Sequence, residues 1–328
     1  MKILVLTAPE VEELLSMKDC IEVMADALAA LARNEVDLPL RSVLRPTNAD
    51  GLMAMMPAYR QGKAKAFGLK AICVFPENPR LGKDAHQGFV MLFSGETGEP
   101  LALMNASAIT AIRTAAVSAL ATRLLAREDA CELALIGSGV QARTHLSAIS
   151  CVRRLRRVRV TSRNHEHARQ LAAEMKDRFP FPIVPLQSVE ESVHAADLIV
   201  TATTSPEPVL RREWISPGTH INAVGTYSAA AREVDGATMA AARIFVDRRE
   251  SALNESGDYV LAAREGLIGP ESILAEIGEV LIGEKNGRTA ADEITLFKSL
   301  GLAIEDVASA QYLLSKAQKD SRGTWIDF

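Results

Sequence analysis

The segment 133–142, LALIGSGVQA, constrains the fold more than any other part of the chain. Its apolar run predicts a buried strand, and Gly137-Ser138-Gly139 breaks that run just before a helix expected to begin at Val140. Such a turn lets the backbone approach a pyrophosphate, and the helix start offers its amides and positive dipole end. An ordinary glycine turn is the alternative, because Ala142 stands where the full pattern has a third glycine.

The segments that follow this turn alternate between helices and strands. We expect helices at 140–151, 165–178 and 188–195, and strands at 156–162, 182–186, 196–205, 220–226 and 243–247. Most of these strands are apolar on both faces, which is typical of a parallel sheet covered by helices on each side. The pattern therefore predicts a Rossmann-type α/β domain.

The end of the second strand of this domain bears on the choice of cofactor. Domains that bind NAD place Asp or Glu about 20 residues after the glycines to hold the ribose hydroxyls. Here Thr161-Ser162-Arg163-Asn164 occupies that place, and no acid precedes Glu166. Hydroxyls and a guanidinium suit a 2′-phosphate, which a carboxylate would repel. We expect NADPH in preference to NADH; the alternative is that Arg163 is a solvated surface residue.

Composition and charge narrow the class of protein. The 328 residues suffice for two domains, and a formal net charge of −4 gives no electrostatic basis for binding nucleic acid. We interpret the basic cluster at 153–159 as a solvated turn and strand edge. We expect no membrane span and a cytoplasmic enzyme. The four cysteines are expected to be buried thiols, and with the six histidines they show no metal-ligand spacing, so we expect no metal.

The remainder of the chain follows a different pattern. We expect helices at 7–13, 18–34, 106–126, 291–301 and 303–318, and strands at 39–46, 51–59, 66–76, 88–94 and 99–105, the last two joined by a turn at 95–98. The simplest packing returns the last helix to the N-terminal domain. The Rossmann-type domain, 116–299, is then inserted into an α+β domain formed by 1–115 and 300–328.

Three basic residues stand out in the N-terminal part. Lys70 interrupts the apolar strand AFGLKAICVF, Arg113 follows the apolar helix start AITAI, and Arg41 lies in PLRS. A charge in an apolar setting requires a partner or an anionic ligand. The alternatives are a solvent-facing Lys70 and an exposed or ion-paired Arg113. Together the three cations suit a small carboxylate substrate beside a nicotinamide.

Several longer segments carry a family resemblance. They include MPAY (56–59), HQGFVMLF (86–93), ITAIRTAAVSALAT (109–122), ESGD (255–258), EIGEVLIGEKNGRT (276–289) and EITLFKSLGLAIEDVA (293–308). On these segments, nearly the whole chain resembles the ornithine cyclodeaminase/mu-crystallin family. The resemblance implies a homodimer whose first domain supplies the dimer platform and the substrate pocket. It also implies hydride transfer between a nicotinamide and the α-carbon of an amino or imino acid.

The resemblance also suggests roles for individual residues. Arg41, Lys70 and Arg113 match positions that surround the substrate carboxylate, and Lys70 also protonates the imine nitrogen or binds water near it. Tyr227 is expected to line the ring pocket or bond the imine nitrogen, with a packed core tyrosine as the alternative. His86 is expected to contact the nicotinamide or donate a proton, with a structural histidine as the alternative. The expected cofactor contacts are Gly137, Gly139, Val140, Gln141, Ser162, Arg163, Asn164, Thr203, Thr204, Val224 and Arg113.

Two departures separate this chain from relatives that act on diamines. Ornithine cyclodeaminases carry Glu two residues before the Met-Pro seen here as Met56-Pro57, where this chain has Ala54. They and the archaeal-type alanine dehydrogenases carry Asp two residues after the glycine of Val224-Gly225, where this chain has Tyr227. A cyclic imino acid has one carboxylate and no distal ammonium, which suits three cations without an acid. We therefore expect an NAD(P)H-dependent reductase of Δ1-pyrroline-2-carboxylate or Δ1-piperideine-2-carboxylate, giving L-proline or L-pipecolate.

Three alternatives stay open. The first is an ornithine cyclodeaminase, which forms L-proline and ammonia, and the second is an opine, N-alkyl amino acid or alanine dehydrogenase. The third is a mu-crystallin-like binding protein without turnover. The presence of Lys70, Arg41, Arg113 and the glycine turn argues against this third alternative, because a pure binder need not retain all four.

Overall fold

The computed structural model describes residues 2–62 and 65–327 of the chain. It divides into two compact units, Met1–Arg113 with Gly301–Phe328, and Thr114–Leu300. We call them the first unit and the second unit. The division falls inside α3 (Ala106–Leu125).

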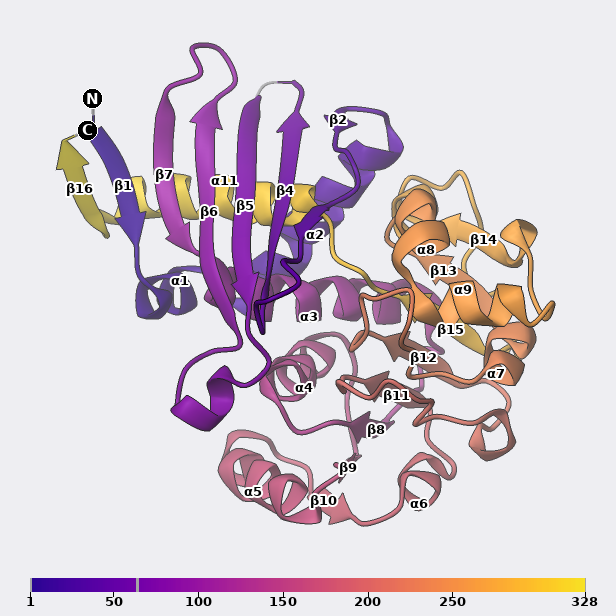
Figure 1. The fold of residues 1–328 in the computed structure, drawn as a ribbon. Helices are drawn as coiled ribbons and strands as arrows, with labels where there is room; N and C mark the ends of the chain where they lie inside the picture. The colour runs from indigo at the N-terminus through magenta and orange to yellow at the C-terminus, as the bar shows by residue number, and fades with distance from the viewer. Residues whose placement is uncertain (1, 63–64, 328) are drawn as a thin grey trace. The chain divides into compact units, whose positions relative to one another are not determined.

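The first unit is built on a mixed sheet (Figure 1). Its described strands follow the order β16-β1-β7-β6-β5-β4-β2, with β3 also paired to β4. Only β1 and β7 pair in parallel among these neighbours. The bounds are β1 Lys2–Leu6, β2 Val36–Asp37, β3 Ser42–Leu44, β4 Leu52–Arg60, β5 Ala66–Val74, β6 His86–Ser94, β7 Pro100–Asn105 and β16 Thr324–Asp327.

In the described part of the first unit, helices cover one face of this sheet and leave the other open. Figure 1 shows α11 (Ala303–Asp320) running across the strands, where it packs on β4 to β7 and on α2 (Met17–Ala32). α1 (Ala8–Leu14) and the short 3₁₀ helix η1 (Asn78–Leu81) complete the unit. The contact with β5 is close, because a Cβ atom on Gly68 would lie 2.3 Å from Cγ2 of Val307.

The open face is apolar. β4 alternates between buried residues, such as Ala54 and Met56, and exposed residues, such as Met53 and Met55. Because successive side chains of a strand point to opposite faces, the exposed apolar side chains lie on the face that the helices do not cover. The exposed large apolar residues of this open face, which we call the apolar face, are Leu44, Met53, Met55, Phe67 and Phe89.

The second unit is a parallel sheet with helices between its strands. The described strands follow the order β10-β9-β8-β11-β12-β15-β13-β14, and every neighbouring pair is parallel. This arrangement confirms the Rossmann-type prediction. The bounds are β8 Glu132–Ile136, β9 Arg157–Thr161, β10 Ile183–Leu186, β11 Leu198–Thr201, β12 His220–Ala223, β13 Arg243–Val246, β14 Ile273–Glu276 and β15 Thr295–Lys298.

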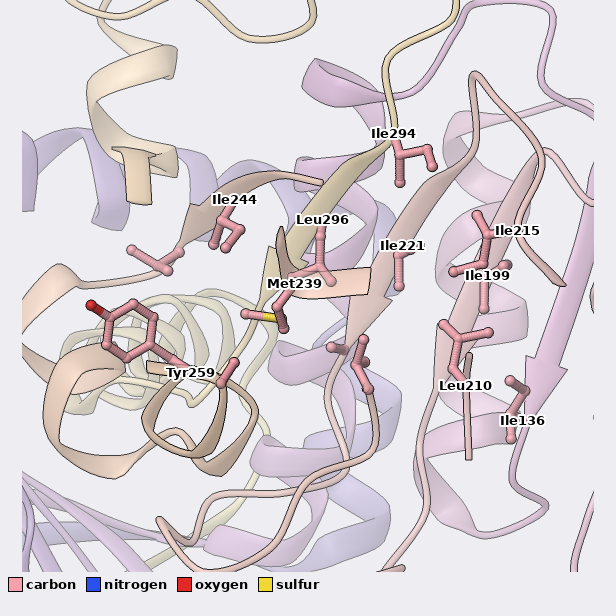
Figure 2. Close-up of a cluster of buried hydrophobic side chains, with 14 of the residues drawn as sticks. Ile136, Ile199, Leu210, Ile215, Ile221, Met239, Ile244, Tyr259, Ile294 and Leu296 are labelled. Atoms are coloured by element: carbon pink, nitrogen blue, oxygen red, sulfur yellow. The ribbon is translucent and has the colours of Figure 1, made fainter. Parts of the chain in front are cut away.

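The helices of the second unit pack on the buried strands. Figure 2 shows one core, in which Ile199, Ile221 and Leu296 come from β11, β12 and β15, while Met239 and Tyr259 come from α7 and α9. The bounds are α4 Val140–Val152, α5 His165–Met175, α6 Val189–Val193, α7 Gly236–Ala241, α8 Arg249–Glu255, α9 Gly257–Arg264 and α10 Ile277–Leu281, with 3₁₀ helices η2 Lys176–Arg178, η3 Arg212–Trp214 and η4 Pro270–Ser272.

The helix predicted at 291–301 is wrong. This segment contains β15, which pairs in parallel with both β12 and β13. All four residues of β15 are buried, so the strand shows no alternation that would distinguish it from a buried helix. The predicted strand at 39–46 is also shorter, since β3 covers only Ser42–Leu44.

Two further expectations concern membrane spans and the cysteines, and only the second is contradicted. α3 is long and apolar enough to cross a membrane by length and composition alone, and 72% of its most apolar stretch is buried inside the protein, as in a core helix. Among the described cysteines only Cys20 is buried, whereas Cys73 and Cys131 are half-buried and Cys151 is exposed.

The basic cluster at 153–159 is solvated as expected at Arg156 and Arg157, whose side chains are exposed, whereas Arg159 is buried. Arg156 and Arg157 lie 2.8 Å from the two carboxylate oxygens of Glu132, and the buried Arg159 lies 3.3 Å from the same side chain. Three cations therefore converge on one carboxylate at the start of β8, which explains the cluster as part of the packing of β8 against β9.

Candidate active site

Four charged side chains meet in the core of the first unit. Lys70 comes from β5, Arg113 from α3, and Glu305 and Asp306 from the first turn of α11. Nζ of Lys70 and Nε of Arg113 each lie 3.1 Å from Oδ1 of Asp306. Nη1 of Arg113 lies 2.5 Å from Oε2 of Glu305. Lys70 is 1% exposed and Arg113 4%, so the solvent-facing interpretation of Lys70 is wrong and Arg113 is a buried ion-pair partner.

The fold explains why these charges are tolerated. Lys70 lies opposite Met56 of β4, on the face that α11 covers. An unpaired buried ammonium would be very costly, so the acids of α11 are required there. Their place in the first turn of α11 is also favourable, because a helix N-terminus stabilises negative charge. The cluster holds two cations and two carboxylates, which corrects the expectation of cations without an acid.

The environment sets the proton affinity of Lys70. Burial, and then the neighbouring Arg113 guanidinium, lower the pKa of Lys70 to about 8, while Asp306 and Glu305 act in the opposite direction. A pKa in this range suits a group that donates a proton near neutral pH and recovers it from water.

The structure places the other two candidate residues of the first unit as follows. Arg41 is half-buried and its Nη2 donates to the carbonyl oxygen of Gly301 at 3.0 Å, just before α11. His86 is half-buried at the start of β6. Burial, then Lys70 and Arg113, lower the pKa of His86, which keeps its imidazole neutral at pH 7. His86 therefore belongs to the electrostatic surroundings of Lys70.

The glycine turn of the second unit lies between β8 and α4. Gly137 has a φ of 121°, and a Cβ atom there would lie 2.4 Å from the carbonyl oxygen of Ala202, so only glycine fits. Gly139 caps α4, and a Cβ atom there would meet nothing within 4 Å. Oε1 of Gln141 is buried without a hydrogen-bond partner among the described residues. These features fit a diphosphate held over the helix start, where Val140 is exposed.

The end of β9 is held against this turn. The Oγ atoms of Ser162 and Ser138 lie 2.8 Å apart. Arg163 is exposed, and Asn164 caps α5 by accepting a hydrogen bond from the Glu166 amide at 3.0 Å. The oxygen of Asn164 and the hydroxyl of Ser162 are thus used in local contacts, whereas the side chain of Arg163 is exposed.

A buried carboxylate that sequence reasoning missed organises the ends of β11 and β12. Glu233 accepts hydrogen bonds from the amide and hydroxyl of Thr203 at 2.6 and 2.7 Å, and from the Gly225 amide at 2.6 Å. Burial raises the pKa of Glu233, against the effect of Lys298. Thr203 therefore contributes its hydroxyl to the loop structure, while Thr204 is exposed and Val224 half-buried beside it.

A second buried pair completes this network. Nζ of Lys298 lies 2.9 Å from Oδ2 of Asp258 and donates to the carbonyl oxygen of Thr226 at 2.8 Å. Oδ1 of Asp258 accepts from the Glu233 and Val234 amides. The buried charges of Lys298 and Asp258 thereby hold the loop after β12 in place. Tyr227 lies on this loop and is 40% exposed, so the core-tyrosine alternative is wrong.

Two residues of this network lie in segments that carry the family resemblance, Asp258 in ESGD and Lys298 in EITLFKSLGLAIEDVA. Nothing in their local pattern indicates that these two residues pair across 40 positions of the chain.

No group of three His, Cys, Asp or Glu side chains that could hold a metal ion occurs within 2–62 and 65–327.

Fold and site together define a class. A parallel sheet in this strand order, with an open glycine turn before its first helix, is a dinucleotide-binding fold. Comparison with known proteins is more specific, because the ornithine cyclodeaminase/mu-crystallin family matches residues 1–321. The chain belongs to the ornithine cyclodeaminase/mu-crystallin family.

Three relatives illustrate the similarity. A Δ1-pyrroline-2-carboxylate reductase of Bacillus cereus is 38% identical over 326 residues, which are 99% of this chain and 100% of that protein. The structure of Thermococcus litoralis Δ1-pyrroline-2-carboxylate reductase in complex with NADH and L-proline has a TM-score of 0.95, with 39% identity over 98% of this chain and 99% of that one. An archaeal alanine dehydrogenase dimer with bound NAD has a TM-score of 0.94, with 35% identity and full coverage of both chains.

Proposed function

We propose that this protein is an NAD(P)H-dependent reductase of cyclic imino acids, converting Δ1-pyrroline-2-carboxylate to L-proline. The single observation that carries this assignment is the buried Lys70 ammonium, held at 3.1 Å by Asp306 and lowered in pKa to about 8. Reduction of a C=N bond requires one proton at nitrogen, and Lys70 is the group in the described first unit that is tuned to supply it. The full-length similarity to two pyrroline-2-carboxylate reductases supports the same reaction.

The chemistry divides between protein and cofactor. When bound, the dihydronicotinamide supplies a hydride to C2 of the ring and becomes the oxidised pyridinium. Lys70 gives a proton from Nζ to the ring nitrogen, so that C=N becomes CH–NH, and recovers a proton from water. Arg41 and Arg113 supply positive charge for the substrate carboxylate, by the family resemblance. The six-membered Δ1-piperideine-2-carboxylate undergoes the same steps and is the second substrate to assay.

The cofactor is a nicotinamide dinucleotide, and we propose NADPH as the preferred form. Two of the relatives described above, the Thermococcus litoralis reductase and the archaeal alanine dehydrogenase, bind NADH and NAD, which supports the cofactor class. Preference for the phosphorylated form rests on the exposed Arg163 and on Ser162 at the end of β9. The first acid of this region, Glu166, lies in the first turn of α5 and pairs with Arg169 at 3.5 Å.

The first unit favours an imino acid over ornithine. Ala54 and Met56 lie on one face of β4, and Met56 lies opposite Lys70, so a residue at position 54 shares the face of Lys70. Ala54 is 5% exposed and offers no carboxylate to a distal ammonium. In the second unit, Thr226-Tyr227-Ser228 likewise has no acid at Tyr227, where the family resemblance places Asp in the cyclodeaminases.

We further propose that the apolar face of the first unit is covered by a second copy of the chain. Five large apolar side chains are exposed there on neighbouring strands, a patch that a monomer rarely leaves open to water. The archaeal alanine dehydrogenase of the same fold is a dimer. Replacing Met55 and Phe67 with Lys should convert the protein to a monomer by analytical ultracentrifugation, whereas an unchanged mass would place the interface elsewhere.

The assignment is tested by substrate profiling. Oxidation of NADPH and NADH is followed by absorbance with Δ1-pyrroline-2-carboxylate, beside L-ornithine with NAD⁺ and an assay for ammonia. We expect rapid imine-dependent oxidation and no ammonia from ornithine. Ammonia and L-proline from ornithine would instead establish a cyclodeaminase that works without the two missing acids.

A further inference from the structure

We propose that Asp306 is the positioning residue of the reaction. One of its carboxylate oxygens holds Lys70 and Arg113 side by side and keeps Lys70 protonated, so that Lys70 can deliver a proton to the imine nitrogen. This inference rests on the proposed reductase function. It adds a residue to which neither the sequence pattern nor the family resemblance gave a role.

The geometry is unusual in how the carboxylate is used. Oδ1 of Asp306 accepts from both Nζ of Lys70 and Nε of Arg113, each at 3.1 Å. Oδ2 is buried and accepts no hydrogen bond from any described residue. Asp306 itself is fully buried. Two cations that repel each other are therefore brought together through one atom, and the position of that atom determines the separation between the proton donor and the guanidinium.

Packing brings the helix of Asp306 close to the strand of Lys70. Asp306 is in the first turn of α11, and the next residue, Val307, is pressed against Gly68 of β5, where a Cβ atom would be 2.3 Å from the valine. Gly68 is two residues from Lys70 on the same strand face. The helix that carries the carboxylate and the strand that carries the ammonium thus meet at a close contact, which only a glycine on the strand permits.

The charges around Lys70 show which partner matters most. Asp306 and Glu305 face it from α11, Arg113 from α3 and His86 from β6, while β4 presents the uncharged Met56. Cys20 of α2 faces Arg113 and Glu305, and burial raises the pKa of its thiol to about 12, so it stays neutral. Burial and Arg113 favour loss of the Lys70 proton; Asp306 opposes them both as a charge and as a hydrogen-bond acceptor, and Glu305 less strongly.

The role in the reaction follows from this balance. Lys70 donates its proton to the ring nitrogen as hydride reaches C2, and its neutral amine then regains a proton from water. Without the carboxylate of Asp306, the neighbouring Arg113 would drive that proton off at lower pH, and Lys70 would enter the reaction as a neutral amine. Asp306 does not touch the reacting atoms in this account; it acts through Lys70.

The test measures the titration of Lys70 directly and by kinetics. Protein labelled with ¹³Cε-lysine is titrated by NMR, with the Lys70 signal assigned by its loss in Lys70→Met. The variants are Asp306→Asn, Asp306→Ser as a smaller neutral replacement if the amide disturbs folding, and Glu305→Gln as the matched control on the same turn. The pH profile of kcat/KM for imine reduction is recorded for each, and Asp306→Glu tests rescue by a longer carboxylate.

We expect the midpoint of the Lys70 titration in Asp306→Asn to be lower by about 1–3 pH units. The alkaline decline of kcat/KM should move to lower pH with it. Glu305→Gln should move both by less, and Asp306→Glu should restore part of the shift. An unchanged Lys70 titration in the neutral Asp306 variants would overturn the inference. A shifted titration in a protein that does not reduce the imine would sustain the pairing and refute the proposed function instead.

Discussion

Nζ of Lys70 lies 3.1 Å from Oδ1 of Asp306, although 236 residues separate them in the chain. The pair joins a strand of the N-terminal sheet to the last long helix, and both side chains are buried. The second unit is inserted between them in sequence. The proton donor of the proposed reaction is therefore built from the two ends of the chain, and only the folded first unit contains it.

Removal of the Lys70 ammonium should abolish turnover without loss of cofactor binding. In Lys70→Met we expect kcat for imine reduction to fall by about 10²–10⁴-fold, the usual contribution of a general acid. Cofactor affinity, measured by quenching of protein fluorescence, should stay within about twofold because the glycine turn lies in the second unit. Near-normal kcat in this variant would exclude Lys70 from proton transfer.

The two directions of the reaction should depend on pH in opposite ways. Reduction requires protonated Lys70, whose pKa is about 8, so kcat/KM for the imine should be level below that pH and decline tenfold per unit above it. Oxidation of L-proline requires the neutral amine, and its kcat/KM should rise through the same range. Parallel limbs in both directions would assign the titration to another group.

Arg163 should set the preference between the two cofactors. Replacement by Asp introduces a carboxylate where a 2′-phosphate would lie, so KM for NADPH should rise by at least tenfold while KM for NADH changes little. The exposed Arg169, on the next turn of α5, provides the matched control as Arg169→Asp. An equal response of both cofactors in Arg163→Asp would show that Arg163 does not contact the phosphate.

The buried pair under the loop after β12 should matter for stability. Lys298→Met leaves Asp258 buried without its cation, which should lower the free energy of unfolding by about 3–5 kcal/mol in urea denaturation. Lys316→Met removes a surface pair with Asp320 and should cost less than about 1 kcal/mol. Similar losses for the two variants would mean that the Lys298 pair is more solvated than its burial indicates.

Much of the fold could be predicted from local pattern. The strand, glycine turn and helix around Gly137 are encoded within ten residues, and the hairpin turn at 95–98 is confirmed by Gly98, whose φ is 75°. β15 could not be predicted in this way, because four buried residues in an interior strand show no periodicity. Its role as a strand depends on β12 and β13, which flank it in the folded sheet.

The residues of the candidate site could likewise be predicted only in part. Lys70 and Arg113 were found from the sequence because a charge inside an apolar run is a local anomaly. Asp306 and Glu305 lie in a helix start where acids are ordinary, so nothing in AIEDVA distinguishes them from capping residues. Glu233 escaped notice for a similar reason, since its partners Thr203 and Gly225 are backbone and hydroxyl donors on other loops.

The most direct test of the account follows the hydride itself. The protein is incubated with Δ1-pyrroline-2-carboxylate and NADPH that carries two deuterium atoms at C4 of the nicotinamide, and the L-proline formed is examined by mass spectrometry and NMR. The account predicts one deuterium per molecule, located on the α-carbon. Unlabelled L-proline, or no L-proline at all, would contradict it.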